Sequence, residues 1–188
     1  MADYEIISEQ NKNYKLGENT QNNYEQFEVV LADIIADSTN NWDEIYVINK
    51  GQKDGIKPKQ VVITKDGLVG YVKNTTAHTS TIITITDAST SFSGRARESR
   101  DKVIIKGNSE LKEKNQIKIK DIPESVILKS GDLIETSGMG GLYPKGILVG
   151  KVISFVENTN PLENEAIAIT SVDFNKLETV AIIINEVL

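Results

Sequence analysis

Short runs of apolar residues, separated by turn-forming residues, dominate the chain from Val29 onward. The runs are rich in valine and isoleucine, which favour extended backbone, and most of them end at Gly, Asn or Asp. Polar and apolar residues alternate within Ser80–Thr86 and Gln116–Lys120, as expected of strands with one buried face. No segment after residue 28 keeps a helical spacing of apolar residues over about ten positions. The pattern predicts strands at 29–35, 44–48, 61–64, 68–72, 80–86, 102–105, 116–120, 133–136, 147–155, 166–170 and 179–184.

Many short strands joined by turns predict an all-β fold. Strands at this spacing are typical of barrels and sandwiches rather than of a parallel α/β sheet. We expect two small β-barrels of about six strands each. Strand character lapses between Ser93 and Asp101, which places the first barrel at residues 29–97 and the second at 98–188. The sequence leaves open whether the C-terminal strand returns to complete the first barrel.

Residues 1–28 have a different composition from the rest of the chain. They hold six acidic residues against two lysines, together with many Asn and Gln side chains. Tyr4, Ile7 and Tyr14 fall at roughly helical spacing, and Gly17 interrupts the pattern. We interpret the segment as the remnant of a coiled-coil helix followed by a linker. A disordered N-terminal arm is the alternative.

The segment from Gly131 to Gly150 contains six of the thirteen glycines. Glycine at this density between β-branched runs predicts sharp turns or close crossing of backbone segments. A similar pattern lies eighty residues earlier, where Lys65–Val72 matches Lys145–Val152 apart from one inserted residue. The repeat favours two similar β units. A phosphate-binding loop is not indicated, because Lys145 precedes Gly146 and a strand follows, although the loop could shape a surface that a partner strand joins.

The net charge is −6, and there is no cysteine. The acidic balance argues against a nucleic-acid partner, and the absence of cysteine excludes disulfides, thiolate zinc sites and a cysteine nucleophile. The basic cluster Arg95–Lys102 is interpreted as a solvated loop or strand end. No apolar run approaches the roughly 18–20 residues that span a bilayer, so any membrane anchor is expected outside this sequence.

The residue types leave two further functions open. His78, the only histidine, precedes Asp87 and Ser137, which is the chain order of a trypsin-like serine hydrolase. Ser137 follows Glu135-Thr136 rather than the Gly-Asp expected before such a nucleophile. A carbohydrate- or peptide-binding module is the other alternative, and it would require a groove lined by aromatic side chains.

The ordered motifs together resemble the MreC family of bacterial rod-shape-determining proteins. They run from Asn49-Lys-Gly51 through Asp66-Gly67 and the Gly131–Val152 block to Val172-Asp173-Phe174, so that the resemblance covers about residues 29–184. The long Gly131–Val152 block is its most specific part. The residues taken as family-motif or structural positions are Gly51, Asp54, Gly55, Gly67, Gly70, Gly131, Asp132, Ser137, Gly138, Gly140, Gly141, Pro144, Gly146 and Gly150.

The resemblance implies a non-enzymatic scaffold of cell-wall elongation with no catalytic residues, cofactor or metal. It also implies a transmembrane helix and a coiled coil ahead of two barrels on the extracytoplasmic side of the bacterial membrane. The implied partners are further copies of the chain, a class B penicillin-binding transpeptidase, MreD and other membrane proteins of the elongation machinery. With most of the coil missing, we expect a monomer or a weak dimer in dilute solution.

Overall fold

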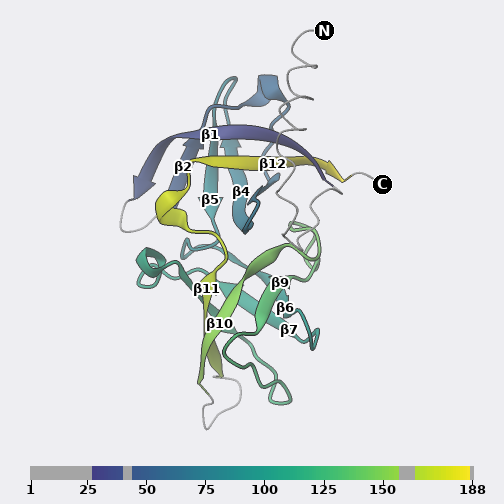
Figure 1. Cartoon of the computed structure of the whole chain (residues 1–188). Helices are drawn as coiled ribbons and strands as arrows, with labels where there is room; N and C mark the ends of the chain where they lie inside the picture. Colours follow the sequence, from purple (N-terminus) through teal and green to yellow (C-terminus); the bar gives the residue numbers. More distant parts are fainter. Residues whose placement is uncertain (1–26, 40–43, 157–163, 187–188) are drawn as a thin grey trace.

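The computed structural model describes residues 27–39, 44–156 and 164–186. This part of the chain folds into twelve β-strands and three short 3-10 helices (Figure 1). The helix or coiled-coil remnant predicted for residues 1–28 lies outside the described residues, apart from Phe27 and Glu28, which begin the first strand. None of the helices in the described part is long and apolar enough to cross a lipid bilayer.

The first barrel closes through six antiparallel strands in the order β1-β12-β3-β4-β5-β2. The C-terminal strand therefore returns to this barrel, where it lies between β1 and β3 (Figure 1). The 3-10 helix Gln52–Asp54 follows β2. The strands are β1 (Phe27–Thr39), β2 (Glu44–Ile48), β3 (Val61–Thr64), β4 (Gly67–Thr75), β5 (Ser80–Thr84) and β12 (Thr179–Glu186).

The second barrel closes in the order β10-β11-β8-β7-β6-β9, again with every neighbouring pair antiparallel. Its 3-10 helix, Lys112–Lys114, precedes β8, and a third, Phe174–Lys176, follows β11 on the way back to the first barrel. The strands are β6 (Ser91–Ala96), β7 (Lys102–Lys106), β8 (Gln116–Lys120), β9 (Leu133–Thr136), β10 (Leu148–Val156) and β11 (Glu165–Thr170).

The predicted boundary between the barrels at residue 97 is too late. Strand β6 lies before that boundary but pairs with β7 and β9 of the second barrel. Its sequence, Ser-Phe-Ser-Gly-Arg-Ala, lacks the β-branched residues that marked the other strands. Pairing with a strand on each side stabilises β6, although its residues have a low preference for extended backbone, because strand preference depends on packing context.

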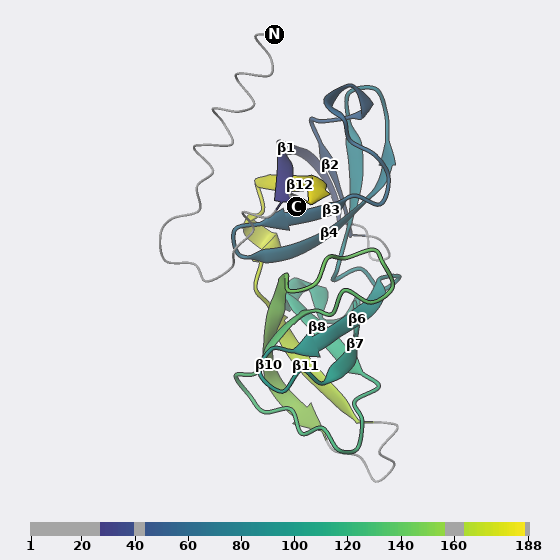
Figure 2. The same cartoon turned by 90° about the vertical axis from the view of Figure 1, so that its right-hand side faces the viewer.

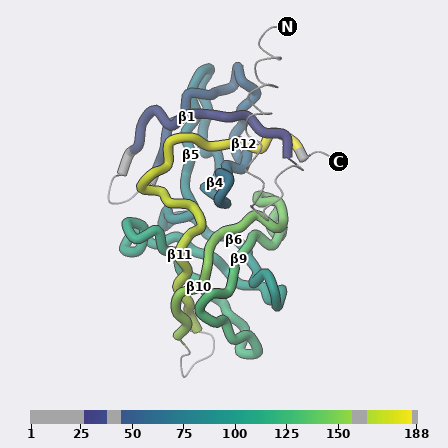
Figure 3. The backbone as a smooth tube through the Cα atoms, in the orientation of Figure 1, coloured from purple at the N-terminus to yellow at the C-terminus, as the bar shows by residue number. Residues whose placement is uncertain are grey.

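The two barrels share one plan. In each, a β-hairpin (β1–β2 or β7–β8) is followed by a three-strand meander (β3–β4–β5 or β9–β10–β11) that pairs in the same order. Strand β6 opens the second barrel at the place that β12 takes in the first. The first barrel is thus a circular permutation of the second, interrupted after β5 by the whole second barrel (Figure 3).

Fully buried isoleucine, leucine and valine side chains fill each barrel. Ile48, Leu68, Ile82 and Ile182 lie inside the first, and Ile105, Ile117 and Ile134 lie inside the second. The two cores join into one cluster across the junction, where the Tyr143 ring packs edge-on against Tyr71 of the first barrel with centroids 6.4 Å apart. The molecule is therefore an elongated stack of two barrels with a continuous apolar centre (Figure 2).

Both chain crossings between the barrels are hydrogen-bonded. In the first crossing, the N–H groups of Gly107 and Asn108 donate to the carbonyls of Thr90 and Thr86 at 3.0 and 3.1 Å. In the second, the Tyr46 hydroxyl donates to the Phe174 carbonyl at 3.1 Å, which ties β2 to the returning chain. Two fixed crossings hold the relative orientation of the barrels more firmly than a single linker would.

Candidate partner-binding groove

The glycine-rich segment forms β9, the start of β10 and the loop between them. The loop is held at its base by Thr136, whose carbonyl accepts from the Gly146 N–H at 2.9 Å and whose Oγ1 accepts from the Ile147 N–H at 2.9 Å. Ser137 donates through Oγ to the Ser93 carbonyl at 3.0 Å, and the same atom accepts from the Met139 N–H at 3.1 Å. Beyond this base, Gly138, Gly140 and Gly141 have φ of 80°, 86° and 72°, a left-handed conformation that favours glycine.

Gly70 and Gly150 occupy the same structural position in the two barrels. Gly70 lies opposite Thr84, and Gly150 lies opposite Thr170. A Cβ at either position would lie 2.0 or 2.2 Å from the carbonyl oxygen of Ile83 or Ile169. The sequence repeat therefore corresponds to a close backbone contact between neighbouring strands that occurs in both barrels.

The remaining motif residues lie at turns and at the junction. The Asp54 carboxylate accepts the Gly51 N–H at 2.9 Å, and the Asp132 carboxylate accepts the Lys129 N–H at 2.8 Å. A Cβ on Gly67 would lie 2.1 Å from Ser171 Oγ and 2.4 Å from the Leu148 carbonyl oxygen, so the start of β4 is pressed against the second barrel. Positive φ is also found at Gly55, Gly131 and Gly146, and Pro144 precedes the end of the loop.

The glycine-rich loop forms one wall of a groove of about 560 Å³ at the junction. The opposite wall comes from the first barrel, from the segment before β3 and the C-terminal end of β12. The lining residues are Lys59, Gln60, Val61, Ser137, Gly138, Gly141, Leu142, Tyr143, Pro144, Lys145, Ile183, Ile184 and Asn185. Sequence reasoning identified the loop but missed the other wall, whose two segments lie far apart in the chain.

Tyr143 is a buried residue of the groove wall. Its side chain is 4% exposed, and its ring packs against Phe92 and, edge-on at 6.4 Å, against Tyr71 of the first barrel. Burial, reinforced by the nearby Tyr71, raises the pKa of the Tyr143 hydroxyl well above its ordinary value, so the group stays protonated. Among the described residues, it is the only buried side-chain polar atom without a hydrogen-bond partner.

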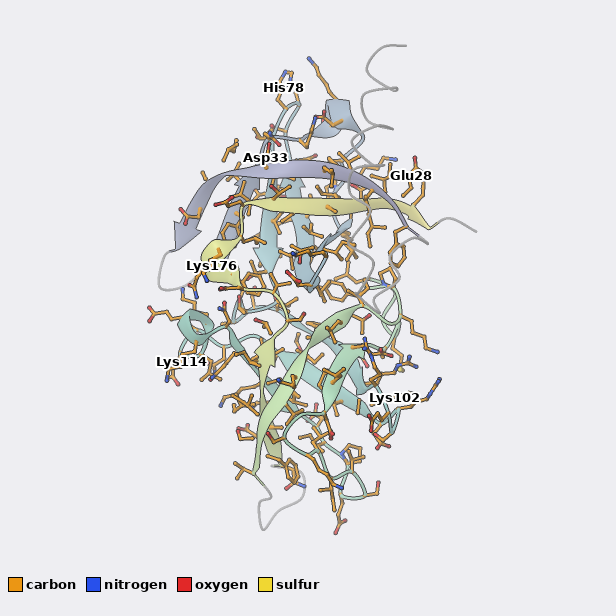
Figure 4. The ribbon with its side chains drawn as sticks, in the orientation of Figure 1. Glu28, Asp33, His78, Lys102, Lys114 and Lys176 are labelled. Atoms are coloured by element: carbon orange, nitrogen blue, oxygen red, sulfur yellow. The ribbon has the colours of Figure 1, made fainter. Side chains whose placement is uncertain are left out.

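The residues of the hydrolase hypothesis are not brought together in a catalytic arrangement. His78 lies in the turn between β4 and β5, at the end of the first barrel that faces away from the second (Figure 4). Its Nε2 is 3.3 Å from Lys53 Nζ. Asp87 is buried in the first crossing and accepts the Ser89 N–H at 2.8 Å, while Ser137 bonds to the Ser93 carbonyl in the second barrel. Within the described ranges, no three His, Asp or Glu side chains form a group that could hold a metal ion.

The basic cluster Arg95–Lys102 begins at the end of β6 and continues through the turn that follows, as the strand-end interpretation predicted, but two of its arginines are ion-paired rather than solvated. Arg95 Nε and Arg97 Nε donate to opposite oxygens of the Glu135 carboxylate at 2.8 and 3.0 Å. The Glu135 side chain is only 8% exposed, and it lies on β9, the neighbouring strand. Arg95 and Arg97 therefore form an ion-pair network with Glu135 in the wall of the second barrel, while Arg100 and Lys102 are exposed.

The fold and the groove define a class of protein: an all-β module of two interlocked six-stranded barrels with an open groove at their junction. The family profile of the rod shape-determining protein MreC, barrel core, matches residues 34–184. The chain belongs to the MreC family.

Curated relatives agree with this assignment. The cell shape-determining protein MreC of Listeria monocytogenes is 29% identical over 150 residues, which cover 78% of this chain and 50% of the relative. The protein of the same name from Bacillus subtilis is 27% identical over 195 residues, covering 99% of this chain and 67% of the relative. The chain thus spans between half and about two thirds of the length of these relatives.

Solved structures share the fold. MreC from Pseudomonas aeruginosa gives a TM-score of 0.78 at 22% identity, covering 83% of this chain and 99% of that one. The Listeria monocytogenes MreC structure gives 0.75 at 25% identity, covering 100% and 90%. A chain from the complex between penicillin-binding protein PBP2 and MreC of Helicobacter pylori gives 0.59 at 14% identity, covering 84% and 100%.

Proposed function

We propose that this chain is the paired-barrel part of a non-enzymatic extracytoplasmic scaffold for bacterial cell-wall elongation and cell-shape maintenance. The observation that carries the proposal is the match of the MreC barrel-core profile to residues 34–184. The presence of both complete barrels supports it, since a scaffold needs folded surfaces rather than a catalytic centre. A transmembrane helix outside these 188 residues would anchor the protein to the cell membrane.

The proposed partners are a class B penicillin-binding transpeptidase, MreD and other membrane components of the elongation machinery, and further copies of the chain. The transpeptidase is supported by the structurally similar Helicobacter pylori complex, in which MreC is bound to PBP2. Self-association would combine coiled-coil pairing upstream of β1 with contacts between barrels. Light scattering on the 188-residue chain should show a monomer or a weak dimer, whereas a tight, concentration-independent oligomer would contradict this part.

The non-enzymatic role is supported by the separate settings of the three candidate catalytic residues. His78 contacts Lys53 at the far end of the first barrel, whereas the Ser137 hydroxyl bonds to the Ser93 carbonyl. A serine nucleophile requires a base within hydrogen-bond reach. We expect His78→Ala to leave cell shape unchanged when the full-length gene product carries it.

Exchange of the barrels tests the scaffold function directly. Residues 29–186 of this chain would replace the matching region of the Bacillus subtilis relative, in cells that lack their own copy. We expect rod shape to be retained and the extracytoplasmic part of the class B transpeptidase to bind the purified chain. A control with Gly150→Val should fail, because that side chain would collide with the Ile169 carbonyl. Round cells containing a folded, correctly anchored hybrid, together with no transpeptidase binding, would contradict the proposal.

A further inference from the structure

The pairing between strands β3 and β12 ends at the groove. Their recorded pairing consists of Ala181 with Ile63 and Ile182 with Val62. Upstream of β3 the chain stays with β4, since the Lys59 N–H donates to the Val72 carbonyl at 2.7 Å and the Val72 N–H donates to the Gln60 carbonyl at 2.8 Å. Lys59 has φ of 71°, a conformation that non-glycine residues seldom adopt.

Beyond Ile182, β12 has a strand neighbour on one side only among the residues that the structure describes. Strand β1 continues beside it as far as the pair Phe27–Glu186. On the other side the pairing with β3 has ended, and Ile183, Ile184 and Asn185 face the groove instead. Such an uncovered strand edge is a template for an additional strand.

The opposite wall also presents unpaired backbone groups. Within the described part of the chain, the N–H groups of Gly140, Leu142 and Tyr143 have no recorded hydrogen bond. The left-handed glycines on either side keep this stretch of loop open rather than folded on itself. Leu142 and Tyr143 of the loop and Ile183–Asn185 of β12 line opposite walls of the same groove.

The chemistry of the lining favours an acidic occupant with apolar side chains. The only charged groups among the lining residues are the exposed lysines Lys59 and Lys145, although the chain as a whole carries −6. Apolar contact surface comes from Val61, Leu142, Pro144, Ile183 and Ile184.

We infer that the groove binds an extended acidic peptide segment of a partner protein, which adds as a strand to the free edge of β12 and lies against the glycine-rich loop. Backbone hydrogen bonds would supply affinity, and alternate side chains of the segment would select for apolar groups within the groove and carboxylates at its ends. Lys59 and Lys145 would receive those carboxylates. The inference goes beyond the proposed function, because it does not depend on which protein carries the segment.

A synthetic probe tests the groove without any cell-wall protein. The probe is acetyl-Glu-Val-Thr-Val-Thr-Val-Glu-amide, titrated into the ¹⁵N-labelled 188-residue chain and followed by amide chemical shifts. We expect the changes to be confined to Gly138–Lys145, Gln60–Val61 and Ile183–Asn185. Replacing both Glu residues of the probe with Lys should weaken binding about tenfold or more, because like charges would then meet across the groove.

Charge exchange in the protein provides the matched control. Lys59→Glu combined with Lys145→Glu should reverse the preference, so that the lysine probe binds more tightly than the acidic one. Lys102→Glu combined with Lys114→Glu changes the net charge equally at exposed sites outside the groove lining and should leave the preference unchanged (Figure 4). A probe with N-methylated valines should bind about tenfold more weakly, since it lacks backbone donors along one edge.

Four results would overturn the inference. They are the absence of any shift at millimolar acidic probe, shifts that centre elsewhere on the barrels, equal binding of the two probes, and unchanged preference after charge exchange at Lys59 and Lys145. If that exchange instead alters the sedimentation of the protein alone, the groove takes a second copy of the chain. The transpeptidase test can still succeed when these fail, so the two proposals are separately testable.

Discussion

Tyr143 shows how one residue can lower stability through a buried hydroxyl group. Its hydroxyl is buried and has no hydrogen-bond partner among the described residues, while its ring packs against Phe92 and Tyr71. A buried unpaired hydroxyl costs about 1–3 kcal/mol. Tyr143→Phe keeps the ring contacts and removes the hydroxyl, so we expect the free energy of unfolding to rise by about 1 kcal/mol in urea denaturation. A loss of stability would mean that the hydroxyl is bonded in solution.

The same variant should change the response to alkaline pH. The folded-state pKa of Tyr143 lies above the ordinary value of 10.0, mainly because burial disfavours the phenolate. The folded protein then holds this proton when the unfolded chain releases it, so wild-type stability is complete below about pH 10 and falls as the pH rises further. Tyr143→Phe should lack that decline, and its advantage over wild type should widen above pH 10. An advantage that stays constant from pH 8 to pH 11 would contradict the burial of the hydroxyl.

Glu135 carries a nearly buried charge in the wall of the second barrel. Its carboxylate lies between Arg95 and Arg97, and its side chain is 8% exposed. Glu135→Gln would remove the carboxylate charge that both guanidinium groups contact. We expect a loss of about 2–4 kcal/mol in urea denaturation, somewhat less than for a fully buried pair because both arginines are partly exposed.

Glu165 provides the control for this substitution. It pairs with Lys120 at 2.8 Å and Lys118 at 3.5 Å, but its side chain is 35% exposed. Exposed pairs contribute little, so Glu165→Gln should cost less than about 1 kcal/mol. The hydrogen bond from Lys120, with the charges of both lysines, lowers the pKa of Glu165, so its small contribution is present at neutral pH and is lost as the pH falls through that lowered pKa. Equal losses for the two variants would show that burial does not distinguish them.

At the scale of elements, the sequence predicted those strands whose own residues favour extended backbone. Such runs as Glu44–Ile48 and Gln116–Lys120 were predicted with the observed bounds. Strand β6 was missed because its stability comes from its neighbours: Gly94 lies close to the Ile105 side chain, and Arg95 pairs with Glu135. The groove was only half predictable, because its wall on the first barrel combines residues 59–61 with residues 183–185. Only the closed fold brings these segments together.

Substitution can separate glycines that allow a close backbone contact between strands from glycines that only allow a left-handed turn. A Cβ at residue 150 would lie 2.2 Å from the Ile169 carbonyl oxygen, which belongs to a paired strand and cannot move freely. Gly150→Ala should therefore cost more than about 3 kcal/mol, and Gly70→Ala should behave alike in the first barrel. Gly140 has φ of 86° and open space around its Cβ position, so Gly140→Ala should cost only about 1–2 kcal/mol of backbone strain. Thermal unfolding would rank the stabilities of the three variants. Comparable losses would show that the close backbone contact at Gly70 and Gly150 does not require glycine.

At the scale of the whole molecule, the two barrels are interlocked by chain order as well as by contacts. Residues 91–170 form the second barrel without interruption, whereas the first barrel needs β12 from the far side of that insertion. The first barrel therefore cannot close until the second has been synthesised. Its closing strand also carries the free edge of the groove, so the groove forms only in the complete chain.

The shared plan predicts that the second barrel folds alone. A fragment of residues 86–172 keeps all six strands together with the bonds of Thr86 and Thr90 to Asn108 and Gly107. We expect dispersed amide resonances and a cooperative thermal transition from this fragment. A fragment of residues 27–85 lacks β12 and should remain unfolded or aggregate, because the edges of β1 and β3 stay open.

A permuted first barrel completes the test. Strand β12 pairs with β1 as an antiparallel neighbour, with Glu186 opposite Phe27, so a short turn can join the two residues as a β-hairpin. A chain that runs from residues 178–186 through such a turn into residues 27–85 would have the strand order of the second barrel. We expect it to fold as a monomer where 27–85 alone does not. If both chains unfold equally while 86–172 folds, the first barrel depends on contacts with the second, such as Gly67 against Leu148, rather than on closure by β12. If 27–85 alone folds as well as the permuted chain, β12 is dispensable, and the circular-permutation relation does not govern folding.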